Sequence, residues 1–376
     1  MNSPSQLTTA EALLLEQTLG LAELGRAGAR PNPVVGALLA RADGTIVSTG
    51  YHERYGEFHA ERRALDAIDI LPSDSVLYVS LEPCAHVGKQ PACADLLIER
   101  GVRRVVIASP DSNPATAGHG PQRLREAGVR VDWGSSVIAR KAIQQNAGFH
   151  ALHQWKRPYV TYKWAMTRNG RMATGAADQP WISSADSRDL VHYMRAGSGA
   201  IAVGIGTVLA DDPLLTVRGP MASRMANPPL RVVFDRALRT PLTSTLVATS
   251  RDAPVLIIAA PDAPIDRQQL LEQAGVEVWR PQPGSALLES ALEELGRRGV
   301  GDLLLESGPR LATAFQQAGL IDALTCFLAP TIAPADQPGF ARNSPIIAAV
   351  RTGQRTQVGP DTAVIRVVHE VAVETL

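Results

Sequence analysis

Short apolar or β-branched runs alternate with amphipathic stretches along the first part of the chain. Two of the runs flank the turn residues Ala42-Asp43-Gly44, which predicts a β-hairpin. The strands predicted here cover residues 34–39, 45–49, 76–80, 105–108 and 129–132. The helices follow an amphipathic N-terminal segment and cover residues 60–68, 93–100 and 121–127. Strands that alternate with helices predict an α/β sheet with helices packed on it.

A second α/β series begins after residues 146–158, a segment that mixes aromatic and basic residues and contains a proline. We place the domain boundary there, between a first domain of residues 1–148 and a second of residues 155–376. The strands predicted in the second domain cover residues 159–163, 200–203, 230–234, 255–259, 302–305 and 324–328. Its helices cover residues 185–195, 287–298 and 310–318, and segments 219–229 and 329–339 have the composition of surface loops.

Size and charge agree with two soluble domains. The chain has 376 residues, of which 45% are hydrophobic and 20% charged, so it holds enough apolar material for two cores. Lys+Arg and Asp+Glu both number 37, and the formal net charge is zero. A polynucleotide-binding protein usually has a basic excess or a basic stripe. The balance argues against a nucleic-acid partner.

The N-terminus and the cysteines favour a cytoplasmic protein. The first twenty residues lack a basic region and are interrupted by Glu11 and Glu16, so they predict an amphipathic helix and not a signal peptide. No run approaches the roughly 18 apolar residues that a membrane span needs. Three cysteines in so long a chain do not indicate a disulfide scaffold. We expect no membrane partner; homo-oligomerisation stays open.

One histidine and two cysteines have the spacing of a catalytic zinc site. His59 and Glu61 open a predicted helix, Cys84 follows a strand, and Cys93 opens the next helix. Three protein ligands leave the fourth tetrahedral position open, as in catalytic zinc sites. This H-x-E…P-C…C pattern is the zinc deaminase signature. It predicts an aminohydrolase with His59, Cys84 and Cys93 as ligands and Glu61 as proton shuttle; the alternative is a structural or lost metal site.

The cysteine spacing narrows the family. Most zinc deaminases have C-x-x-C, whereas eight residues separate Cys84 from Cys93 in PCAHVGKQPAC. This loop resembles PCSHHGRTPPC of the bifunctional riboflavin-biosynthesis deaminase/reductase family. Residues 31–36 (PNPVVG) resemble the family's PNPxVG, whose asparagine, here Asn32, contacts the pyrimidine base. Residues 111–114 (DSNP) resemble its DPNP. The resemblance implies a cytidine-deaminase-like αβα first domain.

The second domain resembles the reductase half of the same family. Residues 203–218 (VGIGTVLADDPLLTVR) carry the likeness, which continues at 157–161 (RPYVT), 181–183 (WIS) and 306–309 (ESGP). The resemblance implies a dihydrofolate-reductase-like α/β fold that uses NADPH. A Rossmann fingerprint is not supported, because Gly204-Ile205-Gly206 lacks the third glycine.

The resemblance also implies the residues that bind ligands. The implied NADPH contacts are Ala165, Trp181, Thr207, Asp211, Gly308, Pro309, Arg310, Leu311 and Ala312. A glycine turn that leads into a helix suits a pyrophosphate. The implied substrate contacts are Asn32, Lys163, Gln179, Arg195, Leu215, Arg218 and Glu306. Arginines suit a phosphorylated substrate, and Glu306 suits the hydroxyls of a ribityl chain. Taken singly, Trp181 is compatible with plain core, Arg195 with a helix end and Lys163 with a surface charge.

Several positions depart from the family pattern, among them residues 174–180, which replace A-S-G-E-S, and residues 89–92 (KQPA), which replace R-T-P-P. Asn169 replaces the aspartate of S-L-D-G-R, and Gln179 stands where a substrate-contacting serine is expected. Val87 replaces the second histidine of the cysteine loop, and Phe58 replaces the proline before His59. None of these changes affects a predicted zinc ligand.

The sequence therefore predicts a bifunctional riboflavin-pathway enzyme. Its first domain would deaminate a phosphoribosylated diaminopyrimidine with Zn²⁺, and its second would reduce the ribosyl group to a ribityl chain with NADPH. The nearest alternative is a diverged monofunctional deaminase for another aminopyrimidine, with a vestigial reductase domain. Two further hypotheses are a non-enzymatic binding protein and a polynucleotide deaminase. The intact zinc motif argues against the binding protein, and the neutral charge and the long cysteine loop argue against the polynucleotide deaminase.

Overall fold

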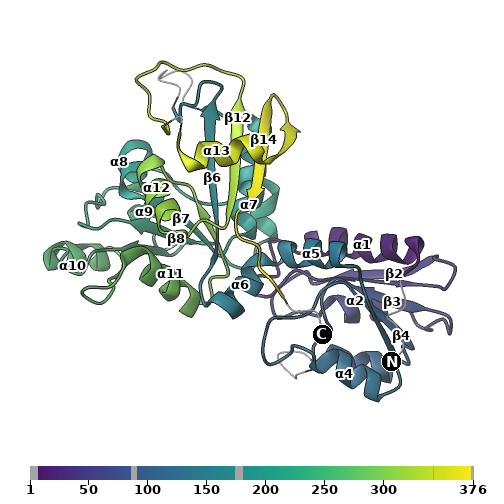
Figure 1. The fold of residues 1–376 in the computed structure, drawn as a ribbon. Helices are drawn as coiled ribbons and strands as arrows, with labels where there is room; N and C mark the ends of the chain where they lie inside the picture. The colour runs from purple at the N-terminus through teal and green to yellow at the C-terminus, as the bar shows by residue number, and fades with distance from the viewer. Residues whose placement is uncertain (1–6, 86–90, 174–180, 342, 374–376) are drawn as a thin grey trace. The chain divides into compact units, whose positions relative to one another are not determined.

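The computed structural model describes residues 7–85, 91–173, 181–341 and 343–373. The chain divides into two compact units (Figure 1). The first contains the residues up to Trp155, and the second contains Lys156–Ser223 and Asn227–Glu370. Among the described residues, none of the helices combines the length and the apolar character needed to cross a membrane.

The first unit is built on a five-stranded sheet of order β2-β1-β3-β4-β5. Its strands are β1 (Gly36–Ala40), β2 (Ile46–Tyr51), β3 (Val76–Val79), β4 (Arg104–Ile107) and β5 (Arg130–Trp133). The predicted hairpin is confirmed, since β1 pairs antiparallel with β2. Strand β1 also pairs antiparallel with β3, whereas β3, β4 and β5 run parallel to one another. Strand β3, which leads to Cys84, therefore lies in the middle of the sheet.

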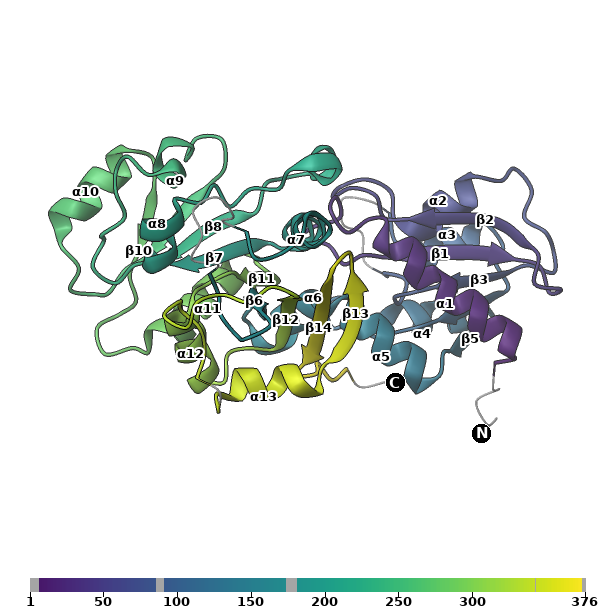
Figure 2. The same ribbon diagram turned by 90° about the horizontal axis from the view of Figure 1, so that it is seen from above.

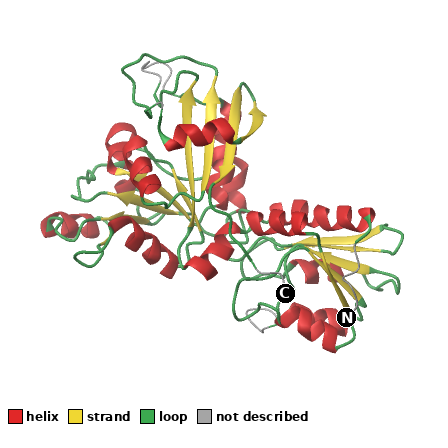
Figure 3. Cartoon of the chain, viewed as in Figure 1, coloured by secondary structure: helices red, strands yellow, loops and turns green. Residues whose placement is uncertain are grey.

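Helices cover both faces of this sheet. They are α1 (Thr9–Glu23), α2 (Ala60–Asp66), α3 (Cys93–Glu99), α4 (His119–Glu126), α5 (Ser136–Gln145) and α6 (Ala147–Trp155). Side chains on a strand alternate between faces: Leu77 packs with α2, α3 and α4, while its neighbour Tyr78 packs with α1 and α5. Figure 3 shows the three layers, and Figure 2 shows α1 lying over β1 and β3. The predicted αβα arrangement is confirmed.

The second unit has a nine-stranded sheet of order β10-β9-β8-β7-β11-β6-β12-β14-β13. Its strands are β6 (Tyr159–Thr167), β7 (Ala200–Gly204), β8 (Leu230–Phe234), β9 (Val255–Ile258), β10 (Glu277–Trp279), β11 (Asp302–Leu305), β12 (Ala323–Ala329), β13 (Gln354–Val358) and β14 (Asp361–Val367). The strands from β10 to β12 run parallel, and β14 and β13 are added antiparallel.

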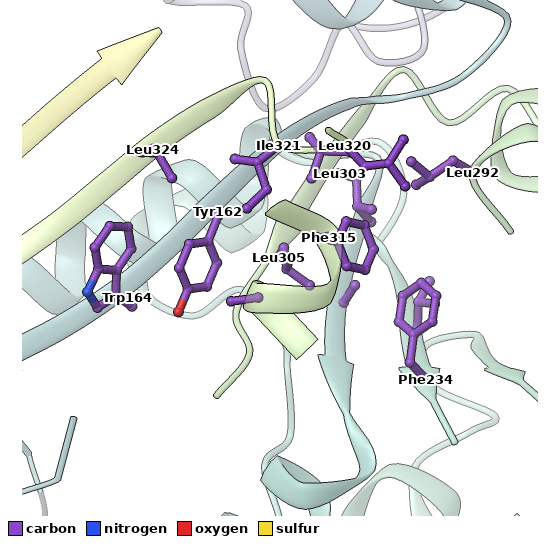
Figure 4. Packing of buried hydrophobic residues seen from close by; sticks show 14 of the residues in the cluster. Tyr162, Trp164, Phe234, Leu292, Leu303, Leu305, Phe315, Leu320, Ile321 and Leu324 are labelled. Atoms are coloured by element: carbon purple, nitrogen blue, oxygen red, sulfur yellow. The ribbon is translucent and has the colours of Figure 1, made fainter. Parts of the chain in front are cut away.

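Two hydrophobic cores lie on the two faces of this sheet. Its helices are α7 (Ala185–Gly197), α8 (Ile205–Asp211), α9 (Thr245–Ala248), α10 (Ile265–Gln273), α11 (Leu287–Arg297), α12 (Pro309–Gln317) and α13 (Pro345–Thr352). One core packs α11, α12 and α13 on the sheet, and the other packs α8, α9 and α10. In the first core Tyr162 stacks on Trp164, and Phe234 meets Phe315 edge to face (Figure 4).

The strands named by the sequence pattern are present, with ends displaced by a few residues. The pattern missed helices α5, α6, α8, α9, α10 and α13 and strands β10, β13 and β14. Helix α6 lies inside the segment 146–158 in which we placed the domain boundary. Residues 219–229, expected to be a loop, contain one 3₁₀ turn, Gly219–Arg224.

Asp322 holds together the start of β6 and the C-terminal end of the second unit. Its side chain is fully buried and accepts two hydrogen bonds from Arg157, at 2.7 and 2.9 Å. It also accepts one from the Val160 N–H at 2.8 Å, and lies 3.1 Å from His369 Nδ1. A buried charge with this many partners is costly to disrupt, because its partners lose their compensation.

We therefore expect Asp322→Ala to lower the free energy of unfolding of the second unit by about 3–5 kcal/mol. Urea unfolding followed by tryptophan fluorescence measures the change. The exposed Asp262 provides the control, since Asp262→Ala should leave the transition within about 0.5 kcal/mol of the wild type. Equal midpoints for the wild type and Asp322→Ala would show that the carboxylate is not an anchor.

Candidate functional site

His59, Cys84 and Cys93 converge in the first unit. One imidazole nitrogen and the two sulfur atoms all lie within 4.8 Å of one another. His59 Nδ1 is 3.3 Å from Cys93 Sγ and 3.7 Å from Cys84 Sγ. One nitrogen and two sulfurs are a donor set that suits zinc. The three residues therefore fit the metal that the motif predicts.

Each ligand lies at the end of an element. His59 is the N-cap of α2, Cys84 follows β3, and Cys93 is the first residue of α3. The Cys93 backbone N–H donates a hydrogen bond to Cys84 Sγ at 3.3 Å. The N-terminus of α3 thus faces the Cys84 sulfur, and such a position favours the negative thiolate that binds a metal.

The environment also separates the protonation states of these groups. Hydrogen bonds from Cys93 and His59 lower the pKa of the Cys84 thiol to about 4. They outweigh burial, which by itself would raise that pKa. Glu61 is buried on α2, and burial raises its pKa. A carboxyl group whose pKa is raised in this way can hold a proton beside the metal ligands.

A pocket opens over His59 and Cys84, and we call it the N-terminal pocket. Among the residues that line it are Asn32, Pro33, Val35, His52, Tyr55, His59, Glu61, Cys84, Asp111, Asn113 and Phe149. The structure therefore brings the predicted base contact Asn32 to the same pocket as Glu61 and two of the three ligands. Residues 86–90 of the cysteine loop, which include Val87, lie outside the described residues.

His52 is a residue of this pocket that the sequence reasoning missed. Its Nδ1 lies 3.2 Å from the Phe58 carbonyl oxygen, which can only accept, and its Nε2 lies 3.2 Å from Asn32 Nδ2. Burial lowers the pKa of His52 to about 4, so the ring is neutral, donates from Nδ1 and accepts from Asn32 at Nε2. The histidine therefore orients the Asn32 carboxamide. Its only signal in the sequence is a second histidine seven residues before His59.

Glu82 anchors the loop that carries the DSNP motif and was also missed. Its carboxylate is buried and accepts a hydrogen bond from the Asp111 N–H at 3.3 Å. Burial raises the pKa of Glu82 to about 7. A Cβ added at Gly120 would lie 1.8 Å from the Pro83 carbonyl oxygen, so the start of α4, which follows this loop, packs directly on the residue before Cys84. Only glycine allows this close approach.

In the second unit, three predicted substrate residues form a buried ionic cluster, which we call the Glu306 cluster. Lys163 Nζ is 3.0 Å from Glu306 Oε2, and Arg195 contacts both carboxylate oxygens, at 2.6 and 3.1 Å. Although burial alone would raise it, the charges of Lys163 and Arg195 lower the pKa of Glu306 to about 2. Glu306 therefore stays ionised at neutral pH.

The cluster corrects two details of the sequence interpretation. Lys163 lies in the middle of β6, which continues to Thr167, and not at a strand end. It is a partner of Glu306 and not a plain surface charge. Arg195 pairs with the Glu306 carboxylate and with the Thr216 carbonyl at 3.0 Å, and its contact with a phosphorylated substrate stays a prediction.

The loop after α8 carries the other predicted substrate residues. Leu215 is buried with a positive φ of 51°, and the exposed Arg218 donates its backbone N–H to His192 Nδ1 at 3.2 Å. The buried Arg231 donates to the Leu214 carbonyl at 3.2 Å, which ties the loop to β8. The loop thus runs beside the Glu306 cluster, with Thr216 bound to Arg195.

The predicted cofactor residues are divided among several elements. Ala165 lies on β6, and Thr207 and Asp211 lie on α8. Gly308 is the N-cap of α12 and Pro309 its first residue; Arg310, Leu311 and Ala312 follow in its first turn. Trp181 is 59% exposed and lies 5.5 Å from the Arg188 guanidinium, so it is not plain core. Gln179 lies outside the described residues.

Asn169, which departs from the family motif, has a structural role. Its Nδ2 donates to the Ala333 carbonyl at 2.7 Å, and its Oδ1 accepts from the Ala333 N–H at 3.1 Å. An aspartate lacks the N–H donor that the first bond requires. The substitution therefore ties the turn after β6 to residue 333.

Comparisons with known proteins agree on one family. Residues 158–364 match the RibD C-terminal domain, and residues 9–109 match the cytidine and deoxycytidylate deaminase zinc-binding region. The riboflavin biosynthesis protein RibD of Actinobacillus pleuropneumoniae is 38% identical over 86% of this chain and 84% of that protein. The Escherichia coli K12 RibD is 36% identical over 87% and 89%. The chain belongs to the RibD family.

Solved structures agree along nearly the whole chain. An Acinetobacter baumannii RibD structure has a TM-score of 0.80 at 32% identity and covers 95% of this chain and 98% of that one. A Thermotoga maritima deaminase/reductase has a TM-score of 0.77 at 29% identity and covers 94% and 97%.

Membership of the RibD family settles the general function. The chain is a bifunctional riboflavin-pathway enzyme with a zinc-binding deaminase domain and an NADPH-dependent reductase domain, and it acts on a small pyrimidine. Both predicted folds and both predicted cofactors are confirmed. The alternative of a monofunctional deaminase is not favoured, because the likeness to RibD extends over both units.

We expect purified protein to contain about one zinc per chain, and Cys84→Ser to lose it, because two protein ligands bind zinc far more weakly than three. Elemental analysis measures the content. Cys326, buried in β12 of the second unit, provides the control: Cys326→Ala should keep its zinc. Active protein with no metal would contradict the assignment.

Proposed function

We propose that the N-terminal pocket is the deaminase site, in a domain of residues 1–148. The reaction we assign to it is hydrolysis of the exocyclic amine of a phosphoribosylated diaminopyrimidine, with release of ammonia. The observation that carries this proposal is the convergence of His59, Cys84 and Cys93 beside the buried Glu61. The similar Thermotoga maritima protein is a diaminohydroxyphosphoribosylaminopyrimidine deaminase, which supports the substrate class.

His59, Cys84 and Cys93 would hold the zinc, and Glu61 would move the protons. Bound zinc supplies a Lewis acid that makes water nucleophilic near neutral pH. Glu61 lies two residues from His59, on the first turn of α2, and is not a member of the ligand set. Its carboxylate takes a proton from the attacking water and returns it to the leaving nitrogen, so that the amine leaves as ammonia. Burial of Glu61, which raises its pKa, helps it to hold that proton.

Asn32 would recognise the pyrimidine in the same pocket. Its carboxamide donates to His52, and His52 is in turn held by the Phe58 carbonyl. This chain of two hydrogen bonds fixes the orientation of the carboxamide before the substrate binds. A pre-oriented amide can discriminate between the donor and acceptor groups on the edge of a pyrimidine.

Glu61→Gln tests the proton shuttle. We expect this variant to keep its zinc but to deaminate roughly 10²–10⁴-fold more slowly, the usual size of general acid–base catalysis. Ammonia release measures the rate, and NADPH oxidation with deaminated substrate should stay at the wild-type level. The exposed Glu53→Gln is the matched control and should deaminate normally. A near-wild-type rate for Glu61→Gln would remove Glu61 from the mechanism.

We propose that the reductase site, in a domain of residues 155–376, lies around the Glu306 cluster. NADPH supplies the hydride that converts the ribosyl group to a ribityl chain. We assign the NADPH contacts to Ala165, Trp181, Thr207, Asp211 and Gly308–Ala312. Gly308 caps a nine-residue helix, whose first N–H groups suit a pyrophosphate.

The substrate would bind between the Glu306 cluster and the loop after α8. We assign its contacts to Lys163, Gln179, Arg195, Leu215, Arg218 and Glu306. Two cations and one carboxylate leave the cluster with one net positive charge. Together with the exposed Arg218, this charge favours a phosphorylated substrate. Glu306 stays ionised, so its carboxylate can accept hydrogen bonds from sugar hydroxyls.

Two variants separate substrate binding from cofactor binding in the reductase. We expect Arg218→Ala to raise mainly the KM for the deaminated pyrimidine, because a phosphate contact far from the reacting carbon binds ground state and transition state alike. Asp211→Ala should instead weaken NADPH binding. Steady-state NADPH oxidation and NADPH fluorescence measure the two effects, with Arg236→Ala, an exposed arginine, as control. Wild-type protein that binds no NADPH would refute the site.

We also propose a cytoplasmic location. The three cysteines are unpaired, as is usual in a reducing compartment.

A further inference from the structure

The residue just before helix α6, Asn146, is hydrogen-bonded to one wall of the N-terminal pocket. Asn146 immediately precedes the helix, and its side chain is buried. Its Oδ1 accepts a hydrogen bond from the Val34 N–H at 2.8 Å, and its Nδ2 donates to the Val34 carbonyl at 2.9 Å. The neighbours Pro33 and Val35 both line the pocket. The carboxamide therefore fixes the Asn32 side of the pocket to the start of α6.

Further along, α6 is hydrogen-bonded to a second pocket loop, the one that carries residues 111–114. His150 Nδ1 lies 2.7 Å from Ser112 Oγ, and Gln154 Nε2 donates to the same oxygen at 3.2 Å. Ser112 lies between Asp111 and Asn113, which both line the pocket. The helix thus joins the two loops that flank the zinc ligands.

Phe149 lies between these two attachment points and lines the pocket itself. Its ring meets the His150 ring at 5.4 Å and the His153 ring at 4.7 Å between centroids, both edge to face. The side chain is half-buried. Two rings of its own helix therefore pack against it, while part of the residue stays accessible.

We propose that Phe149 contacts the pyrimidine ring of the substrate and that α6 is part of the deaminase site. A pyrimidine has polar edges and two apolar faces, and an aromatic side chain stacks on such a face. Asn32 and Glu61 supply polar groups to the pocket, and Phe149 supplies an apolar surface. This inference rests on the proposed deaminase function, and it extends the site past residue 148 into the stretch between the two proposed domains.

Full-length protein carrying Phe149→Leu or Phe149→Tyr tests the contact through steady-state ammonia release. We expect Phe149→Leu to raise the KM about tenfold, the size expected from the loss of one stacking contact, with kcat within about threefold of the wild type. Phe149→Tyr keeps the ring and should stay within about twofold in KM. NADPH oxidation with the deaminated pyrimidine should not change. If Phe149→Leu does not fold, Phe149→Met, which also lacks the ring, takes its place.

The matched control is Trp155→Leu, a second aromatic of α6 that is not among the residues lining the pocket. It should leave the KM for deamination unchanged. A KM unchanged by Phe149→Leu would overturn the proposal, as would equal losses in Phe149→Leu and Phe149→Tyr, or a rise in Trp155→Leu as large as that in Phe149→Leu. Wild-type enzyme that releases no ammonia from the pyrimidine would instead refute the proposed function, and this inference with it.

Discussion

The first unit is organised by the requirement that one imidazole nitrogen and two sulfurs meet within 4.8 Å. The three atoms belong to segments that are separated in the sequence, and each follows or opens a regular element. Strand β3 is paired on both sides, with β1 and β4, so Cys84 leaves the sheet at a fixed point. Helices α2 and α3 then begin beside it. Much of the pocket follows from this geometry, including the burial of Glu61.

Those features that depend on local patterns could be predicted from the sequence. The zinc ligands are recognisable because each element end carries its ligand at a characteristic spacing. Most strands could be predicted because the sequence of a buried strand is a short apolar run. Leu303, Leu304 and Leu305, for example, are all buried in β11, a central parallel strand. The antiparallel strands β13 and β14 were missed because exposed polar residues, such as Arg355 and Arg366, interrupt that pattern.

Features that depend on contacts between distant residues could not be predicted. Ser112 is bonded to His150 across 38 positions, and Lys163 to Glu306 across 143. Nothing near either residue in the sequence indicates its partner. The composition of residues 146–158 suggested a boundary, yet most of that segment is a helix, and Asn146 before it and Gln154 within it hold two pocket loops. His52 was missed for the same reason, since only the folded chain places it beside Asn32.

Two buried glutamates show how the same side chain serves opposite purposes in the two units. Both are removed from water, and burial alone raises the pKa of each. For Glu61, burial outweighs the charge of the neighbouring His59, so its carboxyl group keeps a raised pKa and can carry a proton. Glu306 is paired with Lys163 and Arg195, whose charges outweigh burial and keep it ionised. The chemistry of each site therefore depends less on the presence of a glutamate than on which groups accompany it into the core.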